Sequence, residues 1–324
     1  MRLSSLLLIC IVAAPALAQR NVAAPTNLGT PSLGYVYDST ANGFRPVAGI
    51  PGSAALGPAV HAGFPISMAA VAPDGTFALA VSAGDGIRLV RFWNHKVHTM
   101  SVDGALTSPS LMTFSPSGSA ALLYDSARLQ VVTGLSATPA VQDLNLAGLT
   151  GAASALAVAD DGSLAAMAVN NIVWLVTADA AAQLSLPGSV ITFRPGSHDL
   201  LSATPDGGVY LMQSAAPGGG FRQVHSGDGQ TAGPLAVQFS MDGAQAYVVN
   251  AAGFISDIDL ASGLSSAISC GCAPTALERL NSQSAFRITD AASLPLWLVE
   301  MSPAGPKSWF VPLSAGAASQ GGAQ

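Results

Sequence analysis

The sequence predicts an all-β fold: a β-propeller of four-stranded antiparallel blades, with seven blades favoured and six as the alternative. Three observations lead to this prediction: a repeated turn that carries glycine, short apolar strands on both sides of that turn, and no helical periodicity. A repeat of about 40–45 residues is typical of propeller blades. Such strands hide their apolar faces by stacking sheet against sheet around an axis, which leaves few open sheet edges.

The repeated unit is a short apolar strand, a Pro/Asp/Ser-Gly turn, a second apolar strand that ends in Asp, Asn or Ser, and a third strand. Its turn glycines are separated by steps of 43, 44, 34 and 47 residues: Gly75, Gly118, Gly162, Gly196 and Gly243. A weaker copy lies at 280–285. Proline presets the backbone angle on entry, Asp caps the turn, and Gly supplies the positive φ. The flanking strands are therefore predicted to be antiparallel neighbours.

The strands that follow these turns are apolar on both faces, as in 76–81, 120–124 and 246–250. Strands covered by sheets on both sides have this composition. Third strands are expected at 87–92, 129–132, 172–176, 209–212, 254–258 and 296–299, and weaker fourth strands at 183–186 and 221–224. Six units thus occupy about residues 66–313. Before them, 33–38 and 44–48 form a hairpin around Asn42-Gly43, either a partial seventh blade or part of the ring closure.

The first 18 residues have the pattern of a secretory signal peptide. Arg2 forms a short basic region, 6–14 is apolar, and Ala16-Leu17-Ala18 is a small-x-small cleavage site that leaves Gln19 first. The apolar run is too short for a membrane anchor. We expect a signal peptide at 1–18, a flexible segment at 19–32, a single propeller domain at 33–313 and a flexible tail at 314–324. The predicted location is periplasmic or extracellular, with no membrane span after signal removal.

Charge is scarce in this chain. Of 324 residues, 50% are hydrophobic and 9% are charged, but Gly and Pro interrupt the apolar runs throughout. Removal of residues 1–18 removes Arg2 and no acid, which leaves 11 basic and 18 acidic residues and a formal net charge of −7. Nucleic-acid binding needs several Lys or Arg on one face, and the sequence has no basic cluster. Nucleic acid is therefore not an expected partner.

One segment resembles a known repeat. Residues 246–263 resemble the YVTN-type propeller repeat, in which an inner strand ends in Asn, here Asn250, and a third strand ends in Asp-Leu-x-x-Gly, here residues 259–263. The copies of the type Ala72-Pro73-Asp74-Gly75 are similar to the WD40-like repeats of TolB-type propellers. The Trp-Asp dipeptides of true WD40 repeats are absent. The resemblance implies a propeller over about residues 33–313 and indicates almost nothing about function.

Polar residues follow each second strand, in loops that the repeat places on one rim of the ring. We predict that this rim binds a ligand or partner through Asp85, Asp125, Arg128, Asn170, Asn171, Asp206, Asn250 and Asp290. The alternative is turn chemistry, because Asp and Asn favour such loops for backbone reasons. Separately, Cys270 and Cys272 are the two cysteines of the mature chain. A strained local disulfide, two free thiols, and redox or metal chemistry are all open for this pair.

Patterns of catalytic residues are missing. The sequence contains no Gly-x-Ser-x-Gly elbow, no phosphate-binding glycine loop followed by Lys, and no calcium loop. The five histidines suggest no metal set, and the two glutamates have no evident acid–base partner: His61, His95, His98, His198, His225, Glu278 and Glu300. We therefore expect no catalytic residue, metal site or cofactor.

The predicted function is a non-enzymatic, exported binding or scaffold module. Its expected partner is another envelope or extracellular protein, and the module itself is expected to be a monomer. Two alternatives stay open. One is a propeller-type hydrolase or lactonase with a channel-bound metal. The other is a surface structural or adhesion protein. The scarcity of catalytic residue types favours the binding module, but a fold does not determine a function.

Overall fold

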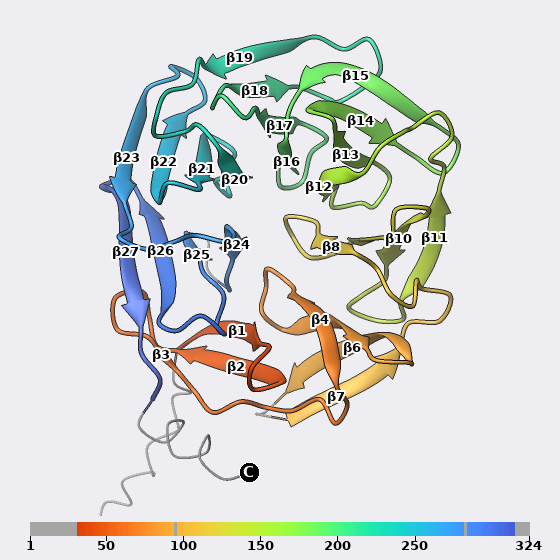
Figure 1. The fold of residues 1–324 in the computed structure, drawn as a ribbon, viewed down its shortest axis with the longest axis vertical. Coiled ribbons are helices and arrows are strands. Elements are labelled where there is room, and N and C mark those ends of the chain that lie inside the picture. Colours follow the sequence, from red (N-terminus) through yellow and green to blue (C-terminus); the bar gives the residue numbers. More distant parts are fainter. Residues whose placement is uncertain (1–30, 94–95, 282–283, 315–324) are drawn as a thin grey trace, which may run out of the picture. The chain divides into compact units, whose positions relative to one another are not determined.

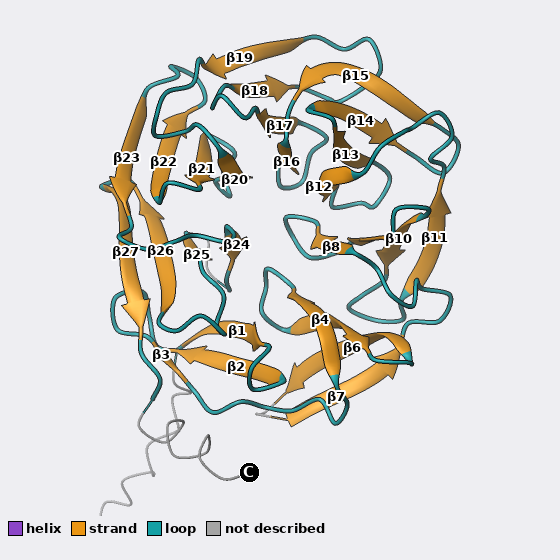
Figure 2. Ribbon diagram, in the orientation of Figure 1, coloured by secondary structure: helices purple, strands orange, loops and turns teal. Residues whose placement is uncertain are grey.

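A computed structural model of the chain describes residues 31–93, 96–281 and 284–314. These residues contain 27 strands and no helix (Figure 2). The predicted signal peptide 1–18, the segment 19–30, His95 and the tail 315–324 lie outside the described residues. Residues from Pro31 onward belong to one structural unit, which is described below. Among the described residues, none form a helix long and apolar enough to cross a membrane.

The strands form seven antiparallel sheets, or blades, arranged around a common centre (Figure 1). Blade 1 contains β1 (Ser32–Asp38), β2 (Gly43–Ala48) and β3 (Ala55–Leu56). Blade 2 contains β4 (Ile66–Val71), β5 (Phe77–Ser82), β6 (Gly86–Trp93) and β7 (Lys96–Ser101). Blade 3 contains β8 (Leu111–Phe114), β9 (Ala121–Tyr124), β10 (Leu129–Thr133) and β11 (Ala140–Leu144). Blade 4 contains β12 (Ala153–Val158), β13 (Ala165–Val169), β14 (Ile172–Val176) and β15 (Ala181–Pro187).

The remaining three blades follow in chain order. Blade 5 contains β16 (Val190–Phe193), β17 (Leu200–Ala203), β18 (Val209–Met212) and β19 (Phe221–His225). Blade 6 contains β20 (Pro234–Phe239), β21 (Gln245–Asn250), β22 (Phe254–Asp259) and β23 (Ser265–Ser269). Blade 7 contains β24 (Glu278–Arg279), β25 (Ala285–Arg287), β26 (Leu296–Ser302) and β27 (Gly305–Val311). The predicted fold class is confirmed, with seven blades rather than six.

The predicted glycine turns join the first and second strands of their blades. All five glycines have positive φ: 67° at Gly75, 79° at Gly118, 71° at Gly162, 66° at Gly196 and 71° at Gly243. In blade 2, the Gly75 amide donates to Ala72 O at 2.8 Å, and the Thr76 amide donates to Asp74 Oδ1 at 3.0 Å. The roles expected for Gly and Asp in these turns are therefore present in the structure.

The core lies between adjacent blades rather than at the centre of the ring. Every residue of β5, β9, β13 and β17 is buried, which confirms that the second strands are covered on both faces. In one such layer, Ala168 and Val173 of blade 4 pack with Phe193 and Met212 of blade 5. Each blade buries its apolar surface against two neighbours, so no blade has a complete core of its own.

Blade 1 differs from the other six. Its first strand, β1, begins beside the glycine turns, because Leu33 O accepts the Asn281 amide at 2.9 Å. It ends beside the start of β4, where the Tyr37 hydroxyl donates to Ile66 O at 2.8 Å. The strand nearest the ring centre in blade 1 therefore runs opposite to the adjacent inner strand β4.

The ring closes by noncovalent pairing of the two ends of the described chain. Leu56 in β3 forms a parallel bridge with Leu313, and its amide donates to Pro312 O at 2.8 Å. The Ser314 amide in turn donates to Leu56 O at 2.8 Å. Blade 1 thus has three strands of its own, with residues 312–314 along its outer edge. The predicted hairpin is both the seventh blade and part of the closure.

Candidate functional site

The propeller has two faces, because successive antiparallel strands reverse direction. We call the face with the Gly75, Gly118, Gly162, Gly196 and Gly243 turns the turn face. We call the opposite face the rim face. It carries the loops between the second and third strands, where seven of the eight predicted rim residues lie, and the eighth, Asn250, is the last residue of β21.

Most predicted rim residues are engaged within their own blades. Asp85 pairs with Arg88 at 3.2 Å, and Asp290 pairs with Arg287 at 2.7 Å. Asp125 accepts the backbone amide of Arg128 at 2.8 Å. These contacts satisfy the carboxylates inside single blades, which is what the turn-chemistry alternative predicted.

The other rim residues follow the same pattern. Arg128 pairs with Asp143 at 2.8 Å. Asn170 and Asn171 form a hairpin turn with φ of 53° and 62°. The Thr204 hydroxyl lowers the pKa of Asp206.

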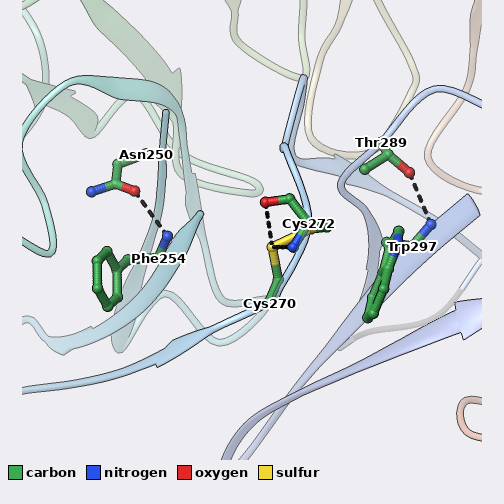
Figure 3. The surroundings of a disulfide bond; sticks show 6 residues. All are labelled: Asn250, Phe254, Cys270, Cys272, Thr289 and Trp297. Atoms are coloured by element: carbon green, nitrogen blue, oxygen red, sulfur yellow. Dashed lines mark hydrogen bonds between the residues drawn. A yellow bond between two sulfur atoms is a disulfide. The ribbon is translucent and has the colours of Figure 1, made fainter. Parts of the chain in front are cut away.

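Asn250 is fully buried at the end of β21 and serves as a loop cap. It donates to Gln230 O at 2.9 Å and accepts the Phe254 amide at 2.9 Å (Figure 3). Binding of a ligand by these eight residues stays a prediction.

A small cavity lies at the ring centre, toward the turn face. Its volume is about 110 Å³, and residues from the inner strands of blades 2 to 7 line it. The lining includes the ends of β4 and β8 together with turn residues such as Pro73, Ser115 and Pro116. None of the eight predicted rim residues lines it. Sequence reasoning missed this site because most lining residues are apolar or small and resemble ordinary strand residues.

Polar residues of blades 3, 5, 6 and 7 line the cavity. Thr192 Oγ1 of β16 lies 3.4 Å from Gln238 Oε1 of β20. In β24, Arg279 Nη2 donates to Phe239 O at 2.6 Å, and its guanidinium carbon lies 4.5 Å from the Phe286 ring centroid. Burial lowers the pKa of Arg279 to about 10, so this side chain is still positively charged at neutral pH. The wall of the cavity therefore contains a positive charge together with hydroxyl and amide groups.

The adjacent acid is already paired. Glu278 Oε2 lies 2.5 Å from Arg287 Nη2, and the same guanidinium pairs with Asp290. Arg287 therefore carries two carboxylate contacts, which raise its pKa further above neutral despite its burial. This arrangement ties the inner strand of blade 7 to its rim loop.

A second polar cluster joins three blades on the turn face. Asp160 of blade 4 accepts the Ser117 amide of blade 3 and the Gly196 amide of blade 5, each at 2.7 Å. Beside it, Asp161 pairs with His198 at 3.0 Å. Through these contacts one aspartate aligns the turns of three consecutive blades.

Replacing Asp160 with alanine is expected to lower the free energy of unfolding by about 1–2 kcal/mol, because two backbone donors lose their acceptor. Chemical denaturation would measure the change. Asp103→Ala, at an exposed position between blades 2 and 3, is the control and is expected to cost less than about 0.5 kcal/mol. Equal costs for the two variants would show that Asp160 does not link the blades.

Asp257 of β22 has a poorly solvated carboxylate. Its Oδ1 atom is buried and has no hydrogen-bond partner within the described residues. Burial, followed by the nearby charge of Asp259, raises the pKa of Asp257 from 3.8 to about 6. Because the folded-state pKa lies above the ordinary value, stability that is fully present below pH 4 is lost as the pH rises through 6.

Asp257→Asn is therefore expected to stabilise the protein by about 1 kcal/mol at pH 7.5, a value that allows for partial exposure of the side chain. At pH 3 the gain should vanish, because the carboxyl is then protonated in both the folded and the unfolded chain. Thermal unfolding at both pH values would measure this, with Asp103→Asn as the matched control. A gain of the same size at pH 3 would contradict the assignment.

Histidine and carboxylate side chains pair rather than cluster. His198 contacts Asp161, and His225 Nε2 lies 3.4 Å from Asp228 Oδ2. Across the described ranges, no three His, Cys, Asp or Glu side chains lie close enough together to hold a metal ion. The expectations of no metal and no cofactor stay predictions.

Seven antiparallel sheets around a narrow centre define this unit as a seven-bladed β-propeller. No family model matches the chain, and no curated protein matches it. Among solved structures, a functionally unknown protein from Desulfotomaculum acetoxidans DSM 771 is similar, with a TM-score of 0.59 and 12% identity. That match covers 87% of this chain and 100% of the other. At this identity the likeness shows the fold alone.

A second solved structure is the β-propeller domain of Cps50 (Swd1) from Myceliophteria thermophila. It aligns with a TM-score of 0.47 and 12% identity over 60% of this chain and 66% of the other.

Proposed function

We propose that this protein is an exported, non-enzymatic binding module that holds a protein partner at the turn face, over the central cavity. The observation that carries the proposal is the cavity itself, because inner strands from six blades converge on it and turn residues reach its edge. The positive charge of Arg279 and the amide group of Gln238 in the lining favour an acidic or amide side chain from the partner. The rim face supports the proposal less well, since its polar residues are engaged within their own blades.

A photo-crosslinking residue at one position on each face tests which face binds. Met241 is 41% exposed in the blade 6 turn, and Asn171 is exposed on the rim face. In the envelope fraction of the native host, the Met241 variant is expected to form one adduct of defined mass, and the Asn171 variant none. Adding Gln238→Ala to the Met241 variant should reduce the adduct yield. Adducts only from Asn171 would move the site to the rim, and none from either face would overturn the binding module.

The proposal also places the protein in the YVTN and WD40-like group of repeat propellers. Asn250 supports this, because the residue that the repeat places at the strand end caps the following turn through the Phe254 amide. Alignment of homologues that keeps Asn at this position in several blades would strengthen the assignment. If homologues carry many different residues at this position, the assignment to this group would be wrong.

Export rests on the N-terminal pattern and gains support from the Cys270–Cys272 disulfide, since disulfides persist in oxidising compartments. The wild-type protein, expressed with its first 18 residues, is expected to be recovered with Gln19 as its N-terminal residue. Ala18→Arg should abolish processing, because the cleavage site needs a small residue there. N-terminal sequencing measures both, and Ala14→Leu in the apolar run is the control. Unprocessed wild-type protein would end the export proposal.

A further inference from the structure

The connector between blades 6 and 7 contains a disulfide that encloses one residue. Cys270 and Cys272 are bonded across Gly271, with a Cα–Cα distance of 5.2 Å. A cross-link stabilises a fold mainly by shortening the loops of the unfolded chain, and the gain falls as the loop becomes smaller. Here the loop is nearly as small as it can be. Stabilisation of the ring is therefore a poor explanation for this bond.

Backbone hydrogen bonds already hold the connector in place. The Cys270 amide donates to Gly253 O at 2.9 Å, and the Thr275 amide donates to Ile288 O at 2.8 Å. Between these anchors, Gly271 is exposed, has a φ of 65°, and has open space where a side chain would lie. The bond can consequently open and close without unpacking blades 6 and 7.

The two cysteine residues differ in burial. Cys270 is 4% exposed and belongs to the buried layer between blades 6 and 7, whereas Cys272 is only partly buried. The backbone amide of Cys272 lies 3.1 Å from Cys270 Sγ (Figure 3). Cys272 is thus the less buried target for an incoming thiolate, and its amide is placed to donate to Cys270 Sγ as negative charge develops there.

We propose that the Cys270–Cys272 pair is a thiol–disulfide exchange site for exposed dithiols of exported peptides or proteins. A substrate thiolate attacks Cys272 Sγ, forms a mixed disulfide and displaces Cys270 as a thiolate. The second substrate thiolate then attacks the substrate sulfur of the mixed disulfide and displaces Cys272. One substrate disulfide forms, the protein pair is reduced, and the two substrate protons end on Cys270 and Cys272.

The reduction equilibrium of the pair tests whether the bond is structural. The mature protein and the same protein in urea are equilibrated with glutathione redox buffers, quenched with acid, and alkylated for mass measurement. By thermodynamic linkage, the free energy by which a disulfide stabilises the fold equals the difference between its free energies of reduction in the folded and the unfolded protein. A structural disulfide must therefore be much harder to reduce in the folded protein. We expect the equilibrium constant for reduction of the pair in the folded protein to agree with the constant in urea within about tenfold. A folded pair that is more than about tenfold harder to reduce would overturn the proposal.

Two single-cysteine variants test the direction of attack. The probe is a synthetic peptide with two cysteines four residues apart. With the oxidised peptide, Cys270→Ser is expected to form a mixed disulfide through Cys272 at least about tenfold faster than Cys272→Ser does through buried Cys270. Circular dichroism confirms that both variants keep the fold. With the reduced peptide, the wild type should yield one peptide disulfide per protein. Equal rates for the two variants, or no peptide oxidation by the wild type, would overturn the proposal.

Discussion

Replacing Phe44 with alanine is expected to lower the free energy of unfolding by about 4 kcal/mol, because the change leaves a large cavity between blades 1 and 2. Phe44 is completely buried. Its ring lies 5.1 Å from that of Phe92 in an edge-on arrangement and 5.6 Å from that of Tyr37. The side chain also packs with Ala78 and Val90 of blade 2. These contacts join the first blade of the chain to the second.

Chemical and thermal denaturation would measure the Phe44 effect, with an expected fall in melting temperature of roughly 8 °C for a unit of this size. Phe310→Ala is the control, since Phe310 is 60% exposed and has one aromatic neighbour, Trp297, at 6.2 Å. Its expected cost is below about 1 kcal/mol. If Phe44→Ala were no more costly than Phe310→Ala, the described packing of blade 1 on blade 2 would be wrong.

Replacing Gly75 with alanine is expected to cost about 3 kcal/mol, from backbone strain and a close contact together. Gly75 has a φ of 67°. A Cβ atom at this position would lie 2.8 Å from Gly34 Cα and 3.2 Å from Asn281 Cβ. The first of these is backbone, which cannot rotate away. The turn of blade 2 thus fits closely against blade 1 and against Asn281, in the turn after β24 of blade 7.

The equivalent turn of blade 5 provides the matched control. Gly196 has nearly the same φ, 66°, but a Cβ atom there would meet nothing within 4 Å. Gly196→Ala is therefore expected to cost only the strain of the left-handed conformation, about 1 kcal/mol. Equilibrium denaturation of the two variants separates strain from close approach. Equal losses of stability would show that blade 1 does not press against the Gly75 turn.

Local sequence patterns were enough to predict the blades and their turns. In the turn after β4, Ala72 O, Asp74 and Gly75 interact with residues at most three positions away, so the sequence alone contains the necessary information. The burial of the second strands was also predictable, because β5 and β13 are apolar at positions facing both sides.

The candidate site was predicted poorly, for a physical reason. Polar residues such as Asp125 and Asn171 stand out in the sequence, but their preference for turns explains that pattern. The central cavity depends on residues such as Thr192, Gln238 and Arg279, which are far apart in the sequence. Only closure of the ring brings them to one place. No local sequence pattern indicates that these residues lie close together.

From the sequence by itself follow the repeat and its antiparallel strand pairs, because each depends on turn preferences and apolar patterning over a few residues. The choice between six and seven blades was left to the structure. Tertiary structure decided the reversed direction of β1, the pairing of Leu56 with Leu313 and the position of the cavity. These features depend on packing between the first and last blades. Such contacts form across almost the whole length of the domain and are set by the closed ring, not by neighbouring residues.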